Sequence, residues 1–210
     1  MVYPPTIVIP NRHHQPRAWT LVLRGLLLAL GLVLIVPAAG ASGPPRAEGV
    51  TLDPLFALRT HDGRPHDAAT YRGRPFVVVF GFTNCPDVCP TALLELSNLM
   101  QELGPSADRL GVFFVSVDPE RDTPEHLREY LSAFDRRIVG LTGDAFQILA
   151  TATAFNAYFE RTSTSGGDYA FDHSTRLYVV DRYGLLARTM PASMEGPQKR
   201  AVLARVLAQR

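Results

Sequence analysis

The sequence predicts an α/β sandwich with a central mixed sheet, and two features carry this prediction. Short, continuously apolar runs alternate with amphipathic segments from about residue 50 onward, as in sheets covered by helices on both faces. The last two apolar runs are separated only by a turn that contains a glycine, which adds an antiparallel hairpin. This order of strands and helices fits a thioredoxin-like fold.

Each expected element has a local reason. The apolar runs at 76–82 and 110–117 are typical of strands buried on both faces. Leucines at helical spacing predict a helix over 91–103, and Thr123 followed by Pro124 predicts a capped helix start. The other expected elements are a short strand at 138–141, a helix at 145–155, strands at 176–181 and 185–189, and a final helix at 196–208.

The N-terminal part of the chain predicts export or membrane anchoring. An apolar run at 25–36 follows three arginines and no acidic residue, which places the N-terminus in the cytoplasm and the rest outside. The run has signal-peptide length, and Ala39-Gly40-Ala41 offers a cleavage site, so a cleaved signal and a short anchor both remain open. No cysteine follows it, which disfavours a lipid anchor. We expect a tail and signal or anchor at 1–41, a linker at 42–49 and one folded domain at 50–210.

Composition, net charge and cysteine content narrow the range of possible functions. With 46% hydrophobic and 20% charged residues the chain is globular, and its net charge of +1 gives no general attraction to nucleic acid. Its two cysteines, Cys85 and Cys89, are too close in sequence for a disulfide between them to stabilise the fold much. A redox pair or a metal-binding pair are the other interpretations.

The surroundings of the cysteines favour a metal. They follow a buried strand and begin a helix, for which Pro86 suits the first position, so the helix dipole favours thiolates. Three residues separate the cysteines, where the common redox motif has two. Two thiolates suit Cu(I), zinc or an iron–sulfur cluster, but structural zinc and clusters normally take four protein ligands. Two thiolates and one imidazole therefore point to copper.

Four histidines are candidates for that imidazole. We expect His61 and His66 to lie on the surface around an Asp62-Gly63 turn, and His126 to be exposed on its helix. His173 follows a polar loop at 162–168 and precedes a strand, near the edge of the sheet where ligands bind. Its position allows either a ligand or a structural role.

Three sequence blocks resemble the Sco (SenC) copper proteins. Gly81-Phe82-Thr83-Asn84-Cys85-Pro86-Asp87-Val88-Cys89-Pro90 is similar to the first signature of that family, residues 116–124 (Ser-Val-Asp-Pro-Glu-Arg-Asp-Thr-Pro) to its second, and Asp172-His173-Ser174 to its third. The likeness covers nearly all of 50–210, and the three blocks occur in the family's order.

The resemblance implies a fold, a site and a role. It implies a thioredoxin-like, membrane-tethered domain that binds one copper ion, as Cu(I) or Cu(II), through Cys85, Cys89 and His173. It also implies loading of the copper A centre of cytochrome c oxidase subunit II, for which a copper donor protein is needed. Asp172 is a candidate to orient His173. The 118–123 block either shapes the site or caps the helix that follows, and we favour the structural role. The domain would face the periplasm from the inner membrane.

Two other functions remain open. A thiol–disulfide reductase that keeps the cysteine ligands of the oxidase reduced would need Cys85 and Cys89 as redox-active thiols, but not His173. Whether the protein is an enzyme therefore stays undecided. A peroxide-reducing enzyme on the same fold would instead need one activated cysteine near an arginine, which paired cysteines with a histidine do not suggest.

Overall fold

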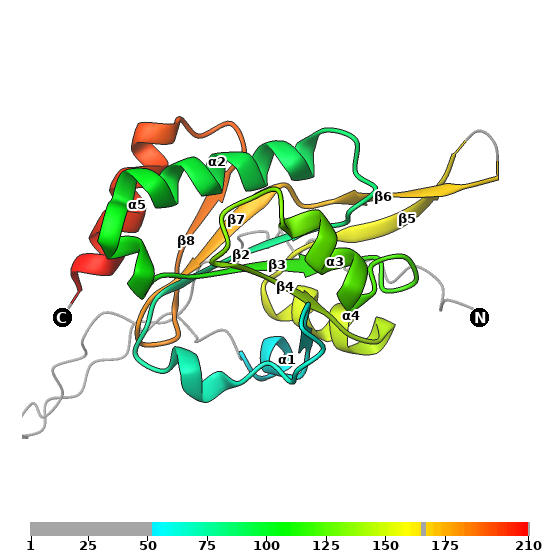
Figure 1. Ribbon diagram of the computed structural model, residues 1–210, viewed down its shortest axis with the longest axis horizontal. Helices are drawn as coiled ribbons and strands as arrows, with labels where there is room; N and C mark the ends of the chain where they lie inside the picture. The colour runs from blue at the N-terminus through cyan, green and yellow to red at the C-terminus, as the bar shows by residue number, and fades with distance from the viewer. Residues whose placement is uncertain (1–51, 165–166, 210) are drawn as a thin grey trace, which may run out of the picture. The chain divides into compact units, whose positions relative to one another are not determined.

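The computed structural model describes residues 52–164 and 167–209. Its elements are shown in Figure 1. In chain order they are α1 (Asp53–Phe56), β1 (Arg59–Thr60), a 3₁₀ turn (Ala68–Tyr71), β2 (Phe76–Gly81), α2 (Val88–Leu103), a second 3₁₀ turn (Gly104–Arg109), β3 (Gly111–Ser116), α3 (Pro124–Leu131), β4 (Ile138–Thr142), α4 (Ala145–Ala154), β5 (Phe159–Ser163), β6 (Tyr169–His173), β7 (Arg176–Val180), β8 (Leu186–Pro191) and α5 (Gly196–Ala208).

The central sheet has the order β1-β4-β3-β2-β7-β8. Strands β2, β3 and β4 run parallel, whereas β1, β7 and β8 join through antiparallel pairings. The predicted mixed sheet is confirmed. Because the three parallel strands end at the same edge, the segments that follow β2 and β3 meet there, and that edge carries the site described below.

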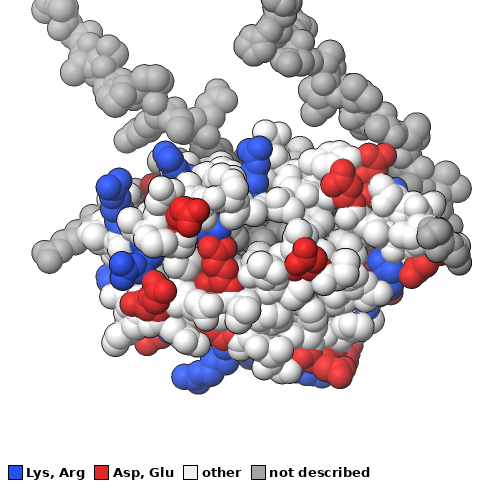
Figure 2. All heavy atoms as spheres, turned by 90° about the horizontal axis from the view of Figure 1, so that it is seen from above, with Lys and Arg blue, Asp and Glu red and all other residues white. Residues whose placement is uncertain are grey.

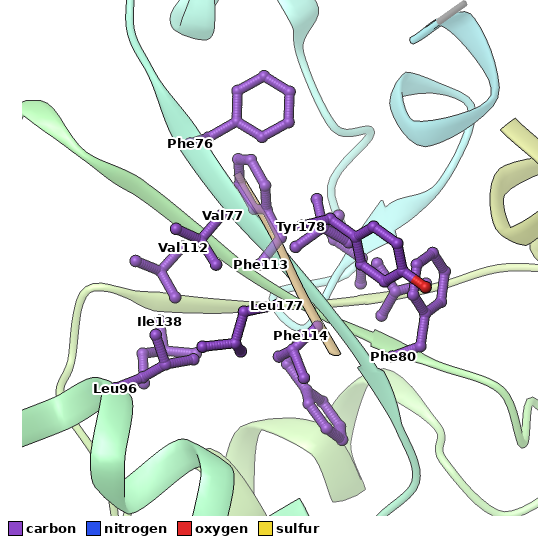
Figure 3. Close-up of a cluster of buried hydrophobic side chains, with 14 of the residues drawn as sticks. Phe76, Val77, Phe80, Leu96, Val112, Phe113, Phe114, Ile138, Leu177 and Tyr178 are labelled. Carbon is purple, nitrogen blue, oxygen red and sulfur yellow. The ribbon is translucent and has the colours of Figure 1, made fainter. Parts of the chain in front are cut away.

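Helices cover both faces of the sheet. In Figure 1, α2, α3 and α5 lie over one face and α1 and α4 over the other. The central strands are therefore buried on both sides, and every residue of β2 and β3 is inaccessible to solvent. Phe113 and Phe114 point to opposite faces, as successive residues of a strand must (Figure 3). This burial explains why both strands appear in the sequence as unbroken apolar runs.

Most expected elements are confirmed, with boundaries shifted by a few residues. The largest shift is in α2, which begins at Val88, so Pro86 lies outside the helix and not at its first position. The capped start of α3 is confirmed, because the Thr123 side chain accepts a hydrogen bond from the His126 backbone N–H. The predicted signal or anchor at 1–41 and the linker at 42–49 lie outside the described residues. None of the helices that the structure describes is long and apolar enough to cross a bilayer.

A hairpin outside the main sheet was not expected. Residues 162–168 were predicted to be a polar loop, but Thr162 and Ser163 belong to β5, which pairs with β6 in a separate two-stranded sheet. Most side chains of β5 are exposed, so the strand has no apolar alternation by which the sequence could reveal it. Among the described residues, Thr164, Gly167 and Asp168 do lie outside the strands, so the loop begins two residues later than predicted and the strand before it was not predicted.

The surface seen in Figure 2 carries charges of both signs. Basic and acidic side chains are interspersed on this face, with broad uncharged areas between them. The electrostatic field of the face in view is therefore mixed in sign, in keeping with the net charge of +1.

Two of the three other histidines differ from expectation. His126 is exposed, as predicted. His61 is partly buried, and its Nδ1 accepts a hydrogen bond of 2.8 Å from the Gly140 backbone N–H. His66 is only 5% exposed and lies among aromatic rings, stacked on Phe56 and edge-on to Phe113, so its predicted surface position was wrong.

The burial of His66 predicts a pH-dependent stability. Burial lowers the pKa of His66 from 6.5 to about 4, and its Nε2 has no hydrogen-bond partner among the described residues. The unfolded chain therefore binds more protons than the folded one between these pH values. The free energy of unfolding should fall as the pH is lowered from 6.5 to 4, by up to about 3 kcal/mol from this residue, and no further below that.

Urea unfolding at several pH values tests this. We expect His66→Phe, which keeps an aromatic ring in place, to have a distinctly shallower loss of stability between pH 7 and 4 than the wild type. His126→Phe, at an exposed position, should keep the wild-type slope. An unchanged slope in His66→Phe would show that the acid sensitivity has another origin.

Candidate metal centre

The two cysteines lie at the junction between β2 and α2. Cys85 is in the connection that follows β2, and Cys89 is in the first turn of α2. Both are free thiols, and they are nearly inaccessible at 8% and 3% exposure. Gly81 permits this close packing, because a Cβ at that position would lie only 2.7 Å from the Cys89 Sγ. The sequence therefore needs glycine at the end of β2.

His173 reaches the same place from the hairpin. It is the last residue of β6 and pairs with Phe159 of β5. Its ring packs edge-on against the ring of Phe82, with 5.8 Å between ring centroids, and Phe171 covers Phe82 from the same strand. These aromatic rings form an apolar wall beside the thiols, which shields the site from water.

The three polar groups converge. The Cys85 and Cys89 sulfurs and a His173 ring nitrogen all lie within 4.8 Å of one another. The Cys89 Sγ and the His173 Nε2 are 3.4 Å apart. No further histidine, cysteine or carboxylate from the described part of the chain joins this cluster, and His61, His66 and His126 all lie elsewhere.

Hydrogen bonding orients the His173 ring for binding a metal. Its Nδ1 lies 3.2 Å from the Ser174 carbonyl oxygen and can donate a proton to it, which leaves the Nε2 lone pair directed at the thiols. Burial lowers the pKa of His173 against the opposing effects of this carbonyl and of Asp172, so the ring is neutral at pH 7. Asp172 itself is exposed, and the Ser174 carbonyl takes the orienting role for which Asp172 was the candidate.

The protonation of Cys89 differs from the sequence-based expectation. The helix dipole predicted a stabilised thiolate, but burial raises the pKa of the Cys89 thiol well above its ordinary value, and the hydrogen bond from the Phe82 backbone offsets this only partly. The neighbouring Cys85 thiol raises it further. Burial outweighs the dipole because desolvation acts on the whole charge of the thiolate.

The donor set fits a soft metal ion. Two sulfurs and one neutral imidazole, buried and within reach of one common point, suit Cu(I) and are acceptable to Cu(II). A bound cation also displaces the thiol protons that burial would otherwise retain. Two surface hollows, of about 470 and 430 Å³, lie elsewhere and are lined by none of the three residues. The three ligand atoms are close enough together to hold one metal ion.

A buried aspartate that sequence reasoning did not single out supports the cysteine segment. Asp122 is completely buried and accepts hydrogen bonds from the Thr83 backbone N–H at 3.1 Å, from the Thr83 hydroxyl at 2.6 Å and from the Ser116 hydroxyl at 2.6 Å. Thr83 lies two residues before Cys85. The 118–123 block is therefore structural, as expected. Through Asp122 it also holds the segment that leads to Cys85.

Comparisons with known proteins find similar sequences and folds over most of the chain. Residues 45–208 match the family described as SCO1/SenC. A SCO2-like protein of Rickettsia prowazekii is 30% identical over 173 residues, which cover 78% of this chain and 84% of that protein. The copper-bound structure of Bradyrhizobium japonicum ScoI is 37% identical with a TM-score of 0.66, over 71% of this chain and 95% of that one. Copper-bound yeast Sco1 is 29% identical with a TM-score of 0.65, over 73% and 87% of the two chains.

Proposed function

Because this chain belongs to the SCO1/SenC family, we propose that it is a copper metallochaperone that helps to assemble the copper A centre of cytochrome c oxidase subunit II. One observation carries the proposal: the sulfurs of Cys85 and Cys89 and a ring nitrogen of His173 lie within 4.8 Å of one another. We assign these three residues as the ligands of a single copper ion.

Each ligand has a distinct task. The two cysteines bind Cu(I) as thiolates, and their two protons are released to solvent on binding. His173 completes the ligand set through its Nε2, and its contribution matters more for Cu(II), which prefers nitrogen ligands more strongly than Cu(I) does. Copper passes to the partner when thiolates of the partner replace Cys85 and Cys89 one at a time.

The same thiols support a second candidate function. Both cysteines are free, and the thiols of Cys85 and Cys89 lie close enough to interact. They can reduce a disulfide of the partner: two electrons and two protons pass to the partner's sulfurs, and a Cys85–Cys89 disulfide forms. This reaction prepares the cysteine ligands of subunit II for copper and does not need His173.

The proposed cellular location of the domain follows from the same role. We propose that the segment at 1–41 directs the domain across the inner membrane or anchors it there, so that it works in the periplasm. A copper donor protein supplies the ion.

A transfer experiment separates the two functions. The full-length protein, reduced and loaded with Cu(I), is mixed with the copper-free soluble domain of subunit II. Copper is measured in each protein after separation. In parallel, the metal-free protein is mixed with subunit II whose cysteines are oxidised, and the thiols of subunit II are counted.

For a metallochaperone we expect copper to move to subunit II. We also expect the His173→Ala variant to bind Cu(II) more weakly than the wild type. The same variant should reduce the disulfide of subunit II at the wild-type rate. If copper stays on this protein while the disulfide of subunit II is reduced, the reductase function replaces the chaperone. Equal loss of both activities in His173→Ala would contradict the separate role assigned to the imidazole.

A further inference from the structure

The hairpin that carries His173 depends on side-chain contacts for its position. Strands β5 and β6 form a two-stranded sheet of their own, and within the described residues no ladder of backbone hydrogen bonds joins them to the six-stranded sheet. In Figure 1 the hairpin projects away from the main sheet. An isolated two-stranded hairpin is at best marginally stable in water. Side-chain contacts between the hairpin and the rest of the domain therefore help to hold His173 beside the thiols.

Tyr169, the first residue of β6, makes several of these contacts at the opposite end of the strand from His173. Its ring lies between two guanidinium groups, with the Cζ of Arg121 at 3.8 Å and that of Arg161 at 3.5 Å from the ring centroid. Its hydroxyl donates a 2.9 Å hydrogen bond to Asp118. The Arg121 Nη1 also donates to the Tyr169 carbonyl oxygen at 3.1 Å. The side chain and the backbone of Tyr169 are thus both engaged.

The inner part of this cluster is well shielded from water. Asp118 is 1% exposed and accepts a hydrogen bond from the Arg121 Nε. The outer pair, Arg161 and Glu120 at 3.2 Å, is more exposed and contributes little, as surface ion pairs generally do. Asp118, Arg121 and Tyr169 therefore form the effective contact, which we term the Tyr169 clamp.

The loop that supplies the clamp also holds the cysteine segment. Asp118, Arg121 and Asp122 all belong to the connection between β3 and α3, at residues 117–123. Asp122 accepts two hydrogen bonds from Thr83, one from its backbone N–H and one from its hydroxyl. One short loop is therefore bonded to both chain segments that provide the candidate ligands.

We propose that the 117–123 loop sets the spacing between the thiols and His173, with the Tyr169 clamp as the positioning device for the hairpin. This inference rests on the proposed function, because it concerns the same copper site. None of the clamp residues is among the candidate ligands. They act through the hairpin by holding the His173 Nε2 close to the Cys89 Sγ.

Substitution of Tyr169 by leucine tests the clamp. Tyr169→Leu removes the ring and the hydroxyl and leaves the Asp118–Arg121 pair intact. We expect the Cu(II) affinity of the full-length protein to fall roughly 10–100-fold, the range found when a residue that orients a metal ligand is lost. The Cu(I) affinity should change little, because two thiolates can still hold Cu(I). Tyr169→Phe, which retains the ring between the guanidinium groups, should lose less.

Tyr183→Leu is the matched control. Tyr183 is exposed, it also lies near a guanidinium group, with the Arg182 Cζ at 5.6 Å, and it belongs to the turn between β7 and β8. This substitution should leave both copper affinities unchanged. A thermal unfolding curve for each variant establishes that it is folded under the conditions of the titrations.

A second measurement uses the metal-free protein. Amide hydrogen exchange of β5 and β6 should become faster in Tyr169→Leu, while exchange in β2 and β3 keeps the wild-type rate. If either the Cu(II) affinity or the exchange of the hairpin stays at the wild-type value, the proposal is overturned. If the wild type itself binds no copper, the proposed function fails, and the exchange rates alone then decide whether the clamp holds the hairpin.

Discussion

Replacing Cys85 or Cys89 with serine is expected to weaken Cu(I) binding by roughly 10²–10³-fold. Structural zinc sites with four ligands bind with about 10–16 kcal/mol, so one ligand contributes about 2.5–4 kcal/mol, and each 1.4 kcal/mol is a factor of ten. A serine hydroxyl is a hard donor and does not substitute for a thiolate towards Cu(I). Anaerobic competition with a chromophoric Cu(I) chelator measures the loss.

His173→Ala should have the opposite selectivity. Because the two thiolates remain, Cu(I) binding should weaken less than in the cysteine variants, whereas Cu(II) should lose its only nitrogen ligand among the three. In the electron paramagnetic resonance spectrum, the nitrogen coupling from His173 should disappear. His126→Ala, at an exposed position outside the cluster, serves as the control and should behave as the wild type.

Two results would contradict the assigned ligand set. If Cys85→Ser bound Cu(I) with wild-type affinity, Cys85 would not be a ligand, even though its sulfur lies within reach of the other two groups. Retention of the nitrogen coupling in His173→Ala would mean that another histidine binds the metal. The described residues offer no such histidine in the cluster, so this outcome would overturn the assigned ligand set.

The two cysteine ligands could be predicted from the sequence because the patterns around them are local. The cysteines flank the junction of an apolar strand and a helix with leucines at helical spacing, and both patterns follow from burial. The position of His173 could not be predicted in the same way. It depends on the β5–β6 hairpin, and β5 is mostly exposed and so lacks the alternation that identifies a strand.

Two other features depend on tertiary packing and were therefore hidden from the sequence. The protonation of Cys89 was misjudged, because the dipole of α2 is visible in the sequence but the depth of burial is not. The role of Asp122 was missed for a similar reason: its partners Thr83 and Ser116 follow or end neighbouring parallel strands, and only the register of β2 against β3 brings them to one carboxylate.

Replacing Glu95 with leucine is expected to lower the free energy of unfolding by about 3–5 kcal/mol, the cost of leaving a buried charge without its partner. The ammonium group of Lys199, in α5, is 1% exposed and donates to both Glu95 carboxylate oxygens, at 2.8 and 2.6 Å. Without Glu95, the Ala192 carbonyl oxygen at 3.0 Å would be its remaining partner among the described residues.

Replacing Lys199 instead of Glu95 should lower the free energy of unfolding by less. Lys199→Met removes the buried charge and keeps a side chain of similar length, and the carboxylate of Glu95, which is 32% exposed, can be solvated by water. The double variant Glu95→Leu/Lys199→Met should recover most of the stability lost in Glu95→Leu, because a buried ion pair can often be replaced by apolar groups at little cost. Urea unfolding of the four proteins gives the coupling energy directly.

The pair also bears on the metal centre, because it fastens α5 to α2, the helix that begins with Cys89 in its first turn. Glu95 lies nearly two turns beyond Cys89, so the folded fraction of each variant should keep the wild-type Cu(I) affinity. If Glu95→Leu were no less stable than Lys199→Met, Lys199 would have to reach solvent or lose its proton when unpaired. If the Cu(I) affinity fell in proportion to stability, the thiols would depend on the whole α2–α5 layer and not on the β2–α2 junction alone.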